Sequence, residues 1–465
     1  MKKIRKFTSL IMFACAAIQS YAQCVATGYE KITQGNYYTA SIKTDGTLWV
    51  WGYNVTGIGG TGTTSTSIKH PQQVGTDADW KDVSAGWGHI VALKTDGTLW
   101  VWGQNAQGQL GLGNNTNVYV PTQVAGTYKA IATGKQHTLV IKTDGTMWGS
   151  GYNDWGGLGI GTSTNVNTFK QAGTDTDWSS MAGGQYHSLA IKNDGTLWAA
   201  GSNIQGQSGT GSFIGENDDF IQIGMENNWK QVAAGQFHSI ALKTTGSVWT
   251  WGSNVSGELG TGTFGGYINT PGQVGTDINW RSVGAGDDNS FALKSNNTLW
   301  GFGNNDYGKL GNDSTIRVNV PTQINSETNW KTIPVNFAYD HSAVIKSDNS
   351  VWSWGWDGSF ELGNGDGVAV SVPYPTQTMC SDNLAVEDIT PNTTQIYPNP
   401  AKENISVKLS SGEKISSINI YDISGKLVKN IPNPNDNKIY VGNLSSGIYF
   451  IKINGNSQNL RFIKK

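Results

Sequence analysis

The chain has 465 residues, of which 61 are glycine and 19 are tryptophan, and only 14% are charged. This composition excludes a disordered chain, because disordered segments are poor in aromatic residues and rich in charge. Acidic residues outnumber basic ones from Gln23 to Gln395, whereas the reverse holds from Ile396 to Lys465. The main part of the chain therefore does not suit nucleic acid or an anionic membrane as its partner.

Residues 1–22 have the pattern of a signal peptide. Basic residues precede an apolar run from Leu10 to Ile18, and small residues stand three and one positions before Gln23. This pattern predicts cleavage before Gln23 and export of the mature chain, and the apolar run is too short to act as a membrane anchor. Lipid attachment at Cys24 is the less favoured alternative, because Gln23 stands where a small residue is needed.

The next part of the chain is organised around ten residues, KTDGTLWVWG at Lys43–Gly52, which return unchanged at Lys94–Gly103. The period is about fifty residues. Weaker copies begin at Lys142, Lys192, Lys243, Lys294 and Lys346. Asp-Gly between two apolar runs predicts a β-hairpin, which we expect to close through a type I′ turn. Alternating apolar residues on both sides predict strands, and the mature sequence shows no helical period.

Each full unit contains four short strands with the patterns W-K-x-V-x-A, H-S-x-A-L-K, L-W-x-W-G and P-x-Q-V. Seven units follow one another from Tyr29 to about Gln377. Four antiparallel strands repeated seven times predict an all-β fold, a seven-bladed β-propeller of four-stranded blades over residues 23–380. An open β-solenoid is the alternative, although about fifty residues is long for one coil of a solenoid.

The units resemble repeats of the regulator of chromosome condensation family. The resemblance rests on Asn105–Gly111 (NAQGQLG), Gly235–Leu242 (GQFHSIAL) and Trp51-Gly52, and it extends around the whole ring. It implies a propeller fold, and it implies binding through one propeller face, because the family includes a secreted bacterial β-lactamase inhibitor of that kind. Some copies depart from the pattern in ways that we interpret as packing variation, at Ser150, Ala200, Ser208 and Phe302.

Two cysteines remain after signal removal, Cys24 and Cys380, and they bracket the propeller. Aligned on the repeat, they occupy neighbouring positions where the last blade meets the first. Because an exported protein with an even number of cysteines favours disulfides, we predict a Cys24–Cys380 bond. Two free surface thiols are the alternative.

The residues after the propeller divide into a polar linker, 381–395, and a small all-β domain, 396–465, which we expect to be a β-sandwich. Tyr397–Ala401, Ile420–Asp422 with Gly425-Lys426, and Gly447–Tyr449 resemble the C-terminal sorting domain of type IX secretion in Bacteroidetes. The resemblance implies contact with the type IX machinery, passage across the outer membrane, and a secreted or surface-attached product. A resident adhesive or sugar-binding sandwich is the alternative.

We find no residue pattern that indicates catalysis. Five histidines share one slot of the repeat, and we interpret them as structural hydrogen-bonding groups. They are His89, His137, His187, His238 and His341. The Asp of each T-D-G is interpreted as a turn residue. The D-x-D pairs at Asp77/Asp79 and Asp175/Asp177 could suit calcium, but the EF-hand spacing is missing. We therefore expect no metal and no cofactor, and the sequence leaves enzymatic activity open without indicating one.

Strand alternation places the G-x-x-H and N-x-x-G loops on one face of the predicted ring. Aromatic residues occupy positions of these loops that vary between units, as is typical of a recognition surface. Packing against neighbouring blades is the alternative. The candidate ligand-binding residues are Tyr37, Tyr53, Trp87, Tyr152, Trp155, Tyr186, Phe237, Tyr307, Tyr339 and Trp356.

These features favour an extracellular protein-binding module of the adhesin or inhibitor kind, acting through this aromatic and acidic face. The alternative is a carbohydrate-binding or polysaccharide-degrading propeller, because aromatic rings beside acidic groups also suit sugars. The sequence names neither ligand.

Overall fold

The computed structural model describes residues 28–213, 215–336, 339–365, 371–378, 395–397, 401–408, 415–422, 425–432, 434, 438–453 and 460–465. The predicted signal peptide, nearly all of the predicted linker, and Cys24 and Cys380 lie outside these residues. The chain divides into two compact units, one comprising Val25–Cys380 and the other containing Ser381–Lys465. Within the described residues, no helix is long and apolar enough to cross a membrane.

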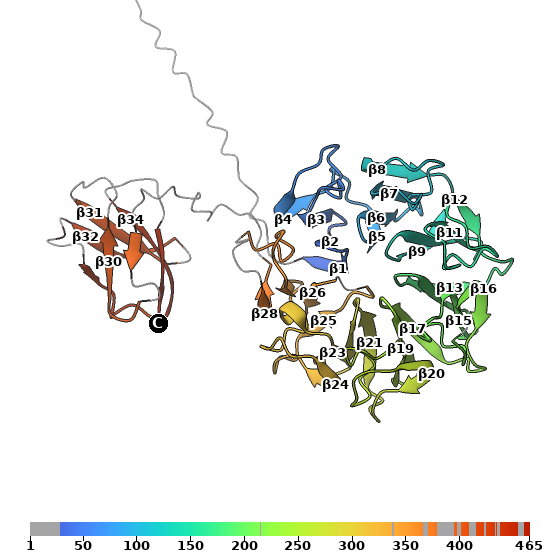
Figure 1. The fold of residues 1–465 in the computed structure, drawn as a ribbon. Helices are drawn as coiled ribbons and strands as arrows, with labels where there is room; N and C mark the ends of the chain where they lie inside the picture. Colours follow the sequence, from blue (N-terminus) through green and yellow to red (C-terminus); the bar gives the residue numbers. More distant parts are fainter. Residues whose placement is uncertain are drawn as a thin grey trace, which may run out of the picture. The chain divides into compact units, whose positions relative to one another are not determined.

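The larger unit is a seven-bladed β-propeller, and its described residues form seven four-stranded sheets arranged in a ring (Figure 1). The first four blades consist of β1 (Tyr29–Gln34), β2 (Tyr38–Lys43), β3 (Leu48–Tyr53), β4 (Ser67–Gln73), β5 (Trp80–Ala85), β6 (His89–Lys94), β7 (Leu99–Gly103), β8 (Val118–Val124), β9 (Tyr128–Thr133), β10 (His137–Lys142), β11 (Met147–Gly151), β12 (Val166–Gln171), β13 (Trp178–Gly183), β14 (His187–Lys192), β15 (Leu197–Ser202) and β16 (Glu216–Gln222).

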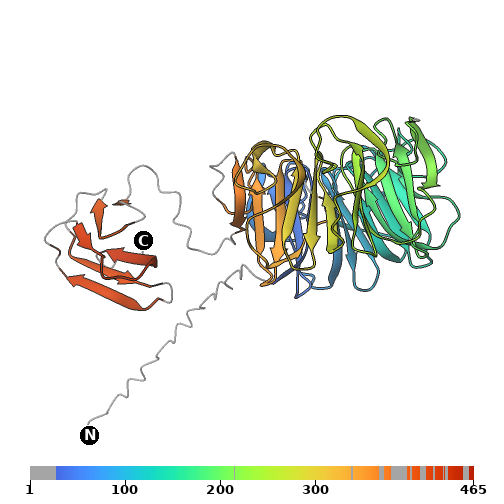
Figure 2. The same ribbon diagram turned by 90° about the horizontal axis from the view of Figure 1, so that it is seen from below.

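The last three blades consist of β17 (Trp229–Ala234), β18 (His238–Lys243), β19 (Val248–Ser253), β20 (Tyr267–Gln273), β21 (Trp280–Ala285), β22 (Asn289–Lys294), β23 (Leu299–Gly303), the 3-10 turn η1 (Asp306–Gly308), β24 (Val318–Gln323), β25 (Trp330–Thr332), β26 (His341–Lys346), β27 (Val351–Gly355) and β28 (Val372–Gln377). In every blade the four strands are antiparallel neighbours in chain order, and they run between the two faces of the ring (Figure 2). The prediction of four antiparallel strands in each unit is thus confirmed.

The ring closes where blade 7 meets blade 1, through side chains and backbone groups buried between them. His341 Nε2 lies 3.0 Å from Thr39 Oγ1. The indole of Trp51 donates to the carbonyl of Glu361 at 2.9 Å, and the backbone amide of Tyr29 donates to the carbonyl of Asn349. Because each blade is built from its own contiguous repeat, closure depends on these contacts between the first and last blades.

The K-T-D-G-T hairpin closes differently from our expectation. Gly46 has a φ of 79°, but Thr44 and Asp45 do not have positive φ, so the type I′ prediction is wrong. Gly46 donates its backbone amide to Lys43, and Lys43 donates to Thr47. This is a three-residue loop with a type I turn and a left-handed glycine. Asp45 Oδ1 accepts from the amide and hydroxyl of Thr47, as predicted for a turn aspartate.

The two tryptophans of each L-W-x-W-G strand have separate structural roles. The first donates its indole N–H to the hydroxyl after the turn, as Trp100 does to Thr98 at 3.0 Å. The second is fully buried and reaches the preceding blade, as Trp251 does when it donates to the carbonyl of Gln207 at 2.8 Å. The second tryptophan therefore fills the space between neighbouring blades.

The repeated lysine of K-T-D-G packs against aromatic rings, and in blades 2, 4, 5, 6 and 7 it also forms an ion pair with an acid. Lys243 Nζ lies 3.6 Å from the centroid of the Trp249 ring, and it forms an ion pair with Glu226 at 2.7 Å. The D-x-D pairs have the same role, because Asp175 and Asp177 both form ion pairs with Lys192. These carboxylates therefore neutralise a lysine of their own blade, which leaves the calcium interpretation without support.

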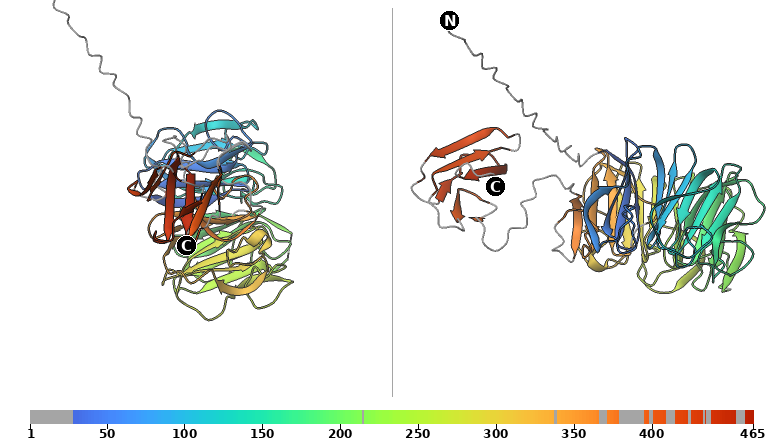
Figure 3. Two further views of the ribbon diagram at one scale, coloured as in Figure 1. Left: turned by 90° about the vertical axis from the view of Figure 1, so that its left-hand side faces the viewer. Right: turned by 90° about the horizontal axis from the view of Figure 1, so that it is seen from above.

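The C-terminal unit is a small β-sandwich. One sheet contains β29 (Gln395–Tyr397), β30 (Asn404–Lys408) and β33 (Lys438–Tyr440), and the other contains β32 (Leu427–Pro432), β31 (Ser417–Tyr421), β34 (Gly447–Ile453) and β35 (Leu460–Lys464) (Figure 3). Ile405 and Ile439 from the first sheet share one buried core with Ile420, Ile451 and Phe462 from the second. Facing apolar residues from two sheets are what holds such a sandwich together.

Candidate functional site at the channel mouth

The G-x-x-H and N-x-x-G loops of each blade lie side by side on one face. The residue after the third strand's glycine donates its amide to the residue before the histidine slot. Tyr53 donates to Tyr37 at 2.8 Å, and Ser202 donates to Tyr186 at 2.8 Å. Each blade therefore presents a pair of loops that hold each other in place at the same end of the ring.

The histidine slot belongs to the scaffold beneath these loops. His238 Nε2 lies 3.0 Å from Ser290 Oγ in the next blade, and Ser290 donates its hydroxyl proton to the carbonyl of Glu258. The histidine must therefore donate to the serine from Nε2. Burial lowers the pKa of His238 to about 4, so the ring stays neutral at ordinary pH.

The same link recurs from blade to blade, with the pairs His89–Thr138, His137–Ser188, His187–Ser239 and His341–Thr39. In blade 1, the hydroxyl of Tyr38 replaces it and donates to backbone carbonyls of blade 2. The structural interpretation of the histidines agrees with this geometry, because each one joins two blades.

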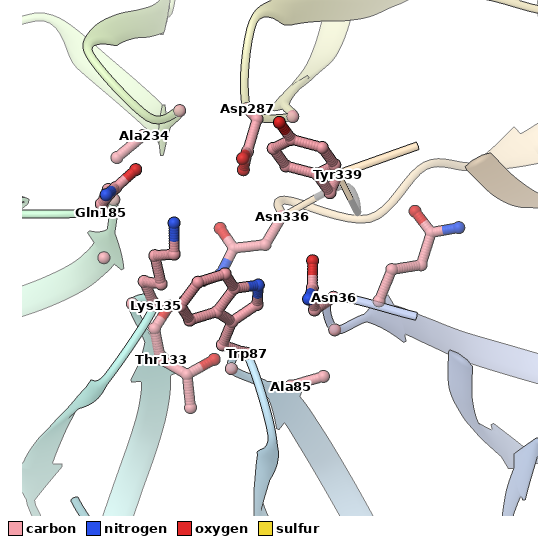
Figure 4. A pocket seen from close by; sticks show the side chains of 18 of the residues that line it. Asn36, Ala85, Trp87, Thr133, Lys135, Gln185, Ala234, Asp287, Asn336 and Tyr339 are labelled. Atoms are coloured by element: carbon pink, nitrogen blue, oxygen red, sulfur yellow. The ribbon is translucent and has the colours of Figure 1, made fainter. Parts of the chain in front are cut away.

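The two variable positions of the G-x-x-H loop point to different places. The residue directly after the glycine reaches the central channel, where a pocket of about 460 Å³, including space open to solvent, lies at the channel mouth (Figure 4). We call this the channel pocket, and its main side chains come from Gln34, Asn36, Trp87, Lys135, Gln185, Asp287, Asn336 and Tyr339. The second variable residue lies outside the pocket.

Backbone hydrogen bonds between neighbouring blades hold the pocket wall. Trp87 donates its amide to the carbonyl of Lys135 at 2.9 Å, and Lys135 donates to Gly184 at 3.0 Å. Gln236 donates to Asp287 at 2.9 Å. The side chains of the pocket project from backbone that is hydrogen-bonded between neighbouring blades. Their positions are therefore set by the packing of the blades and not by free loops.

Blade 7 departs from the repeat and sends a segment into the channel. The spacing from Trp330 to His341 is two residues longer than the spacing from Trp229 to His238 in blade 5. Val335 accepts a hydrogen bond from the amide of Ala285 in blade 6. Asn336 then reaches across the channel and donates its side-chain amide to the carbonyl of Thr133 in blade 3, at 2.8 Å. Figure 4 shows the Asn336 side chain in the pocket.

Charges of opposite sign stand on different blades of the channel pocket. Lys135 Nζ lies 3.7 Å from the centroid of the Trp87 ring, and burial lowers its pKa. Burial also raises the pKa of Asp287 to about 6, an effect that Lys135 opposes and Asp288 reinforces. The pKa of Asp340 rises to about 6 for the same first reason, burial. The pocket therefore combines a half-buried cation, Lys135, with the carboxylate of Asp287, and Asp340 lies just outside it.

The ten predicted binding residues divide between this pocket and two outer groups. Only Trp87 and Tyr339 line the pocket, and they are 38% and 39% exposed. One outer group, on blades 3 to 5, is a chain of ring contacts that comprises Tyr152, Trp155, Tyr186 and Phe237. The other, on blades 1, 6 and 7, comprises Tyr37, Tyr53, Tyr307 and Trp356. We call these the first and second aromatic rims.

The second rim contains a strained residue. Tyr307 is 41% exposed, has a φ of 60°, and lies 4.8 Å from the Trp356 ring. A side chain other than glycine is held in this left-handed region at an energetic cost, and such positions cluster at functional sites. The surrounding loop thus fixes an exposed tyrosine in one orientation.

Sequence reasoning missed most of the channel pocket. The predicted binding residues did not include Asn36, Lys135, Gln185, Asp287 or Asn336. Four of these five stand at or near the position directly after the loop glycine, so a comparison of that single column across the seven units would have found them. Asn336 has no counterpart in the other units.

Comparison with known families gives a consistent result. The family description "Regulator of chromosome condensation (RCC1) repeat" matches residues 45–93, 96–141, 245–293 and 296–345, and a second description of the same repeat matches five stretches between residues 80 and 309. The description "Secretion system C-terminal sorting domain" matches residues 395–465.

Curated relatives share only part of their length with this chain. The human probable E3 ubiquitin-protein ligase HERC4 is 34% identical over 137 residues, which are 29% of this chain and 13% of that protein. The ultraviolet-B receptor UVR8 of Arabidopsis thaliana is 27% identical over 158 residues, 34% of this chain and 36% of the receptor.

Solved structures show the same fold. Human WBSCR16 has a TM-score of 0.63 at 20% identity, over 72% of this chain and 94% of that one. Yeast RCC1 (Prp20) bound to Kap60 has a TM-score of 0.63 at 19% identity, over 75% of this chain and 85% of that one.

Proposed function

Because the chain belongs to the regulator of chromosome condensation repeat family and ends in a type IX secretion sorting domain, we propose that it is an extracellular protein-binding module. The sorting domain supports secretion or display at the cell surface. The proposed binding surface is the face that carries the two aromatic rims, and its ligand is a protein. Adhesin-like and inhibitor-like roles both fit this proposal.

The first aromatic rim is the observation that carries the proposal. Tyr186 contacts Tyr152, Trp155 and Phe237, with ring centroids 5.6 to 6.3 Å apart. All four side chains are only partly buried, so the rings of three blades form a continuous part of the surface. Large, rigid aromatic side chains on a fixed scaffold are the residues that dominate protein interfaces.

The test is capture of a partner from the medium or from cell-surface extracts by the mature chain. We expect Trp155→Ala and Tyr186→Ala to abolish capture of a protein that the unchanged chain retains. The control is Tyr374→Ala, because Tyr374 is 53% exposed on β28 of blade 7, outside the first aromatic rim. Equal capture by all four chains would refute the role of the rim.

A carbohydrate ligand is the second candidate, and the channel pocket is the observation that favours it. The pocket places aromatic rings, amides and a carboxylate around a small space, and such groups suit sugar hydroxyls as well as protein groups. A glycan array separates the candidates, because glycan retention without protein capture contradicts the first proposal. Polysaccharide cleavage would appear in the same assay as loss of the arrayed glycan.

Maturation follows from the proposed domain plan. We assign 1–22 to a signal peptide, 23–380 to the propeller, 381–395 to a linker and 396–465 to the sorting domain. The Cys24–Cys380 disulfide belongs to this plan, as a staple between the first and last blades. Mass spectrometry of the exported protein tests all three features, through the mature N-terminus, the presence of the tail, and a mass shift on reduction.

A further inference from the structure

We propose that the channel pocket binds one ring of a neutral, polyhydroxylated ligand, such as the terminal sugar of a glycan. The proposal deepens the second candidate function and rests on it. It uses the channel pocket and not the aromatic rims, so it can fail independently of the protein-binding proposal.

Buried amide groups without partners are the first argument. Gln34 is 2% exposed and Gln185 is 8% exposed, yet both amide atoms of Gln34 and the Oε1 of Gln185 have no hydrogen bond within the described structure. The Oδ1 atoms of Asn36 and Asn336 are also buried without a hydrogen-bond partner in the described structure. All four side chains line the channel pocket. A buried polar atom without a partner costs about 1 to 3 kcal/mol, so such a group is poised for a ligand or solvent.

The orientation of one of these amides is fixed by the scaffold. Asn336 donates its Nδ2 to the carbonyl of Thr133, so its Oδ1 is an acceptor that faces away from that bond. The other amides can present either oxygen or nitrogen to the pocket by rotation. A hydroxyl group both donates and accepts, and so it satisfies either orientation. This match favours a ligand that carries several hydroxyls.

The balance of charge argues against a strongly charged ligand. Lys135, from blade 3, and Asp287, from blade 6, line the same pocket but form no ion pair with each other within 4.0 Å among the described residues. An anion would meet the carboxylate of Asp287, whose pKa is raised by burial first and then by the charges of Asp288 and Asp340. A cation would meet Lys135. A neutral ring can donate hydroxyls to the Asp287 carboxylate and accept from the Lys135 ammonium.

The remaining walls suit a ring-sized ligand. Trp87 and Tyr339 provide partly exposed aromatic surface, against which the apolar face of a sugar ring can pack. Asn336 reaches into the channel from blade 7, so the channel pocket accommodates a chain end better than a chain that threads the ring.

The proposal is tested by saturation-transfer NMR and calorimetry on the full mature chain. The probes are glucose, galactose, mannose and N-acetylglucosamine at millimolar concentration, with glycine and glutamine as zwitterionic comparisons. Two variants address the pocket, Asp287→Asn and Gln185→Leu. Asp287→Asn keeps the side-chain size and removes a carboxylate whose burial is unfavourable, so we expect it to fold. Gln185→Leu replaces the amide with a slightly smaller apolar side chain. The control is Asp154→Asn, an exposed acid on the same face outside the pocket.

We expect at least one of the four sugars to bind. Asp287→Asn should weaken that binding by about tenfold or more, because a hydrogen bond to a charged group is lost. Gln185→Leu should weaken it also, whereas Asp154→Asn and the rim variant Tyr186→Ala should leave it unchanged. The proposal is overturned if no sugar binds, if the pocket variants bind the sugar as the unchanged chain does, or if an amino acid binds in its place.

Discussion

The sharpest test of the scaffold concerns His341, which joins blade 7 to blade 1. Its Nε2 lies 3.0 Å from Thr39 Oγ1, and the side chain is 1% exposed. Burial lowers the pKa of His341 from 6.5 to about 3. The unfolded chain therefore binds a proton at this residue more readily than the folded chain does. The stability that neutral His341 contributes is present above pH 6.5 and is lost as the pH falls toward 3.

The magnitude follows from the size of that difference. One pKa unit corresponds to about 1.4 kcal/mol. Between pH 7 and pH 5 the unfolded histidine becomes protonated while the folded one does not, so His341 alone removes about 2 kcal/mol of unfolding free energy over this interval. Asp287 and Asp340 also titrate there and act in the opposite direction, so only a difference between variants isolates the histidine.

The variant is His341→Asn, because asparagine already occupies this slot at Asn289 in blade 6. At pH 7 we expect it to be less stable than the unchanged chain by about 1 to 3 kcal/mol, since a buried hydrogen bond is lost. At pH 5 the deficit should shrink by about 2 kcal/mol, because asparagine does not titrate. Denaturant unfolding followed by tryptophan fluorescence at both pH values measures these differences.

Thr39→Val is the matched control for this experiment. It removes the same hydrogen bond without removing a titrating group, so its deficit should be equal at the two pH values. If the deficit of His341→Asn does not change between pH 7 and pH 5, then His341 is protonated in the folded state, and the account of the histidine slot as a neutral link between blades is refuted.

Four further outcomes are expected. Trp251→Phe should be mild, because phenylalanine stands in that slot in blade 6, whereas Trp251→Ala should cost about 3 to 5 kcal/mol in denaturant unfolding. Glu226→Gln should cost less than about 1 kcal/mol because the acid is half exposed, while Lys243→Ala should cost about 2 kcal/mol through lost packing between two indole rings. Added calcium should leave the melting temperature unchanged, because the D-x-D carboxylates already form ion pairs with lysines. An upward shift of several degrees on adding calcium would contradict this expectation. Reduction of a Cys24–Cys380 bond should lower stability by up to about 4 to 5 kcal/mol, and an unchanged mass on reduction shows that no bond exists.

The fold could be predicted because its determinants repeat. The K-T-D-G hairpin and the W-K-x-V-x-A strand recur seven times, so an uncertain strand assignment in one copy is corrected by the others. The number of copies gives the number of blades. The turn type was wrong because the sequence letters Asp-Gly are compatible with two loops. Only the neighbouring hydrogen bonds between Lys43 and Thr47 decide for a type I turn with a left-handed Gly46.

The candidate site was harder to predict, because depth within the ring cannot be read from a single repeat. Tyr186 and Gln185 are adjacent in sequence and equally variable, yet Gln185 lines the channel and Tyr186 lies on a rim. The sequence-based prediction named aromatic residues because such side chains are common in binding sites, and most of the residues that it named lie on the rims. The pocket depends instead on polar residues such as Lys135 and Asn36, whose role becomes visible only when seven blades bring them together.

Blade 7 contains a departure from the repeat that bears on the candidate site. Its two additional residues look like a minor irregularity between Trp330 and His341, and a repeat-based interpretation would discount them. In the folded ring they allow Asn336 to bond Thr133 on a distant blade, and they replace the backbone link that the other blades form at that level. Closure of the ring needs blades of similar backbone structure, whereas a binding site needs different side chains from different blades. The departure from the repeat thus places Asn336 in the channel pocket, and the proposed selection of a ligand there depends on it.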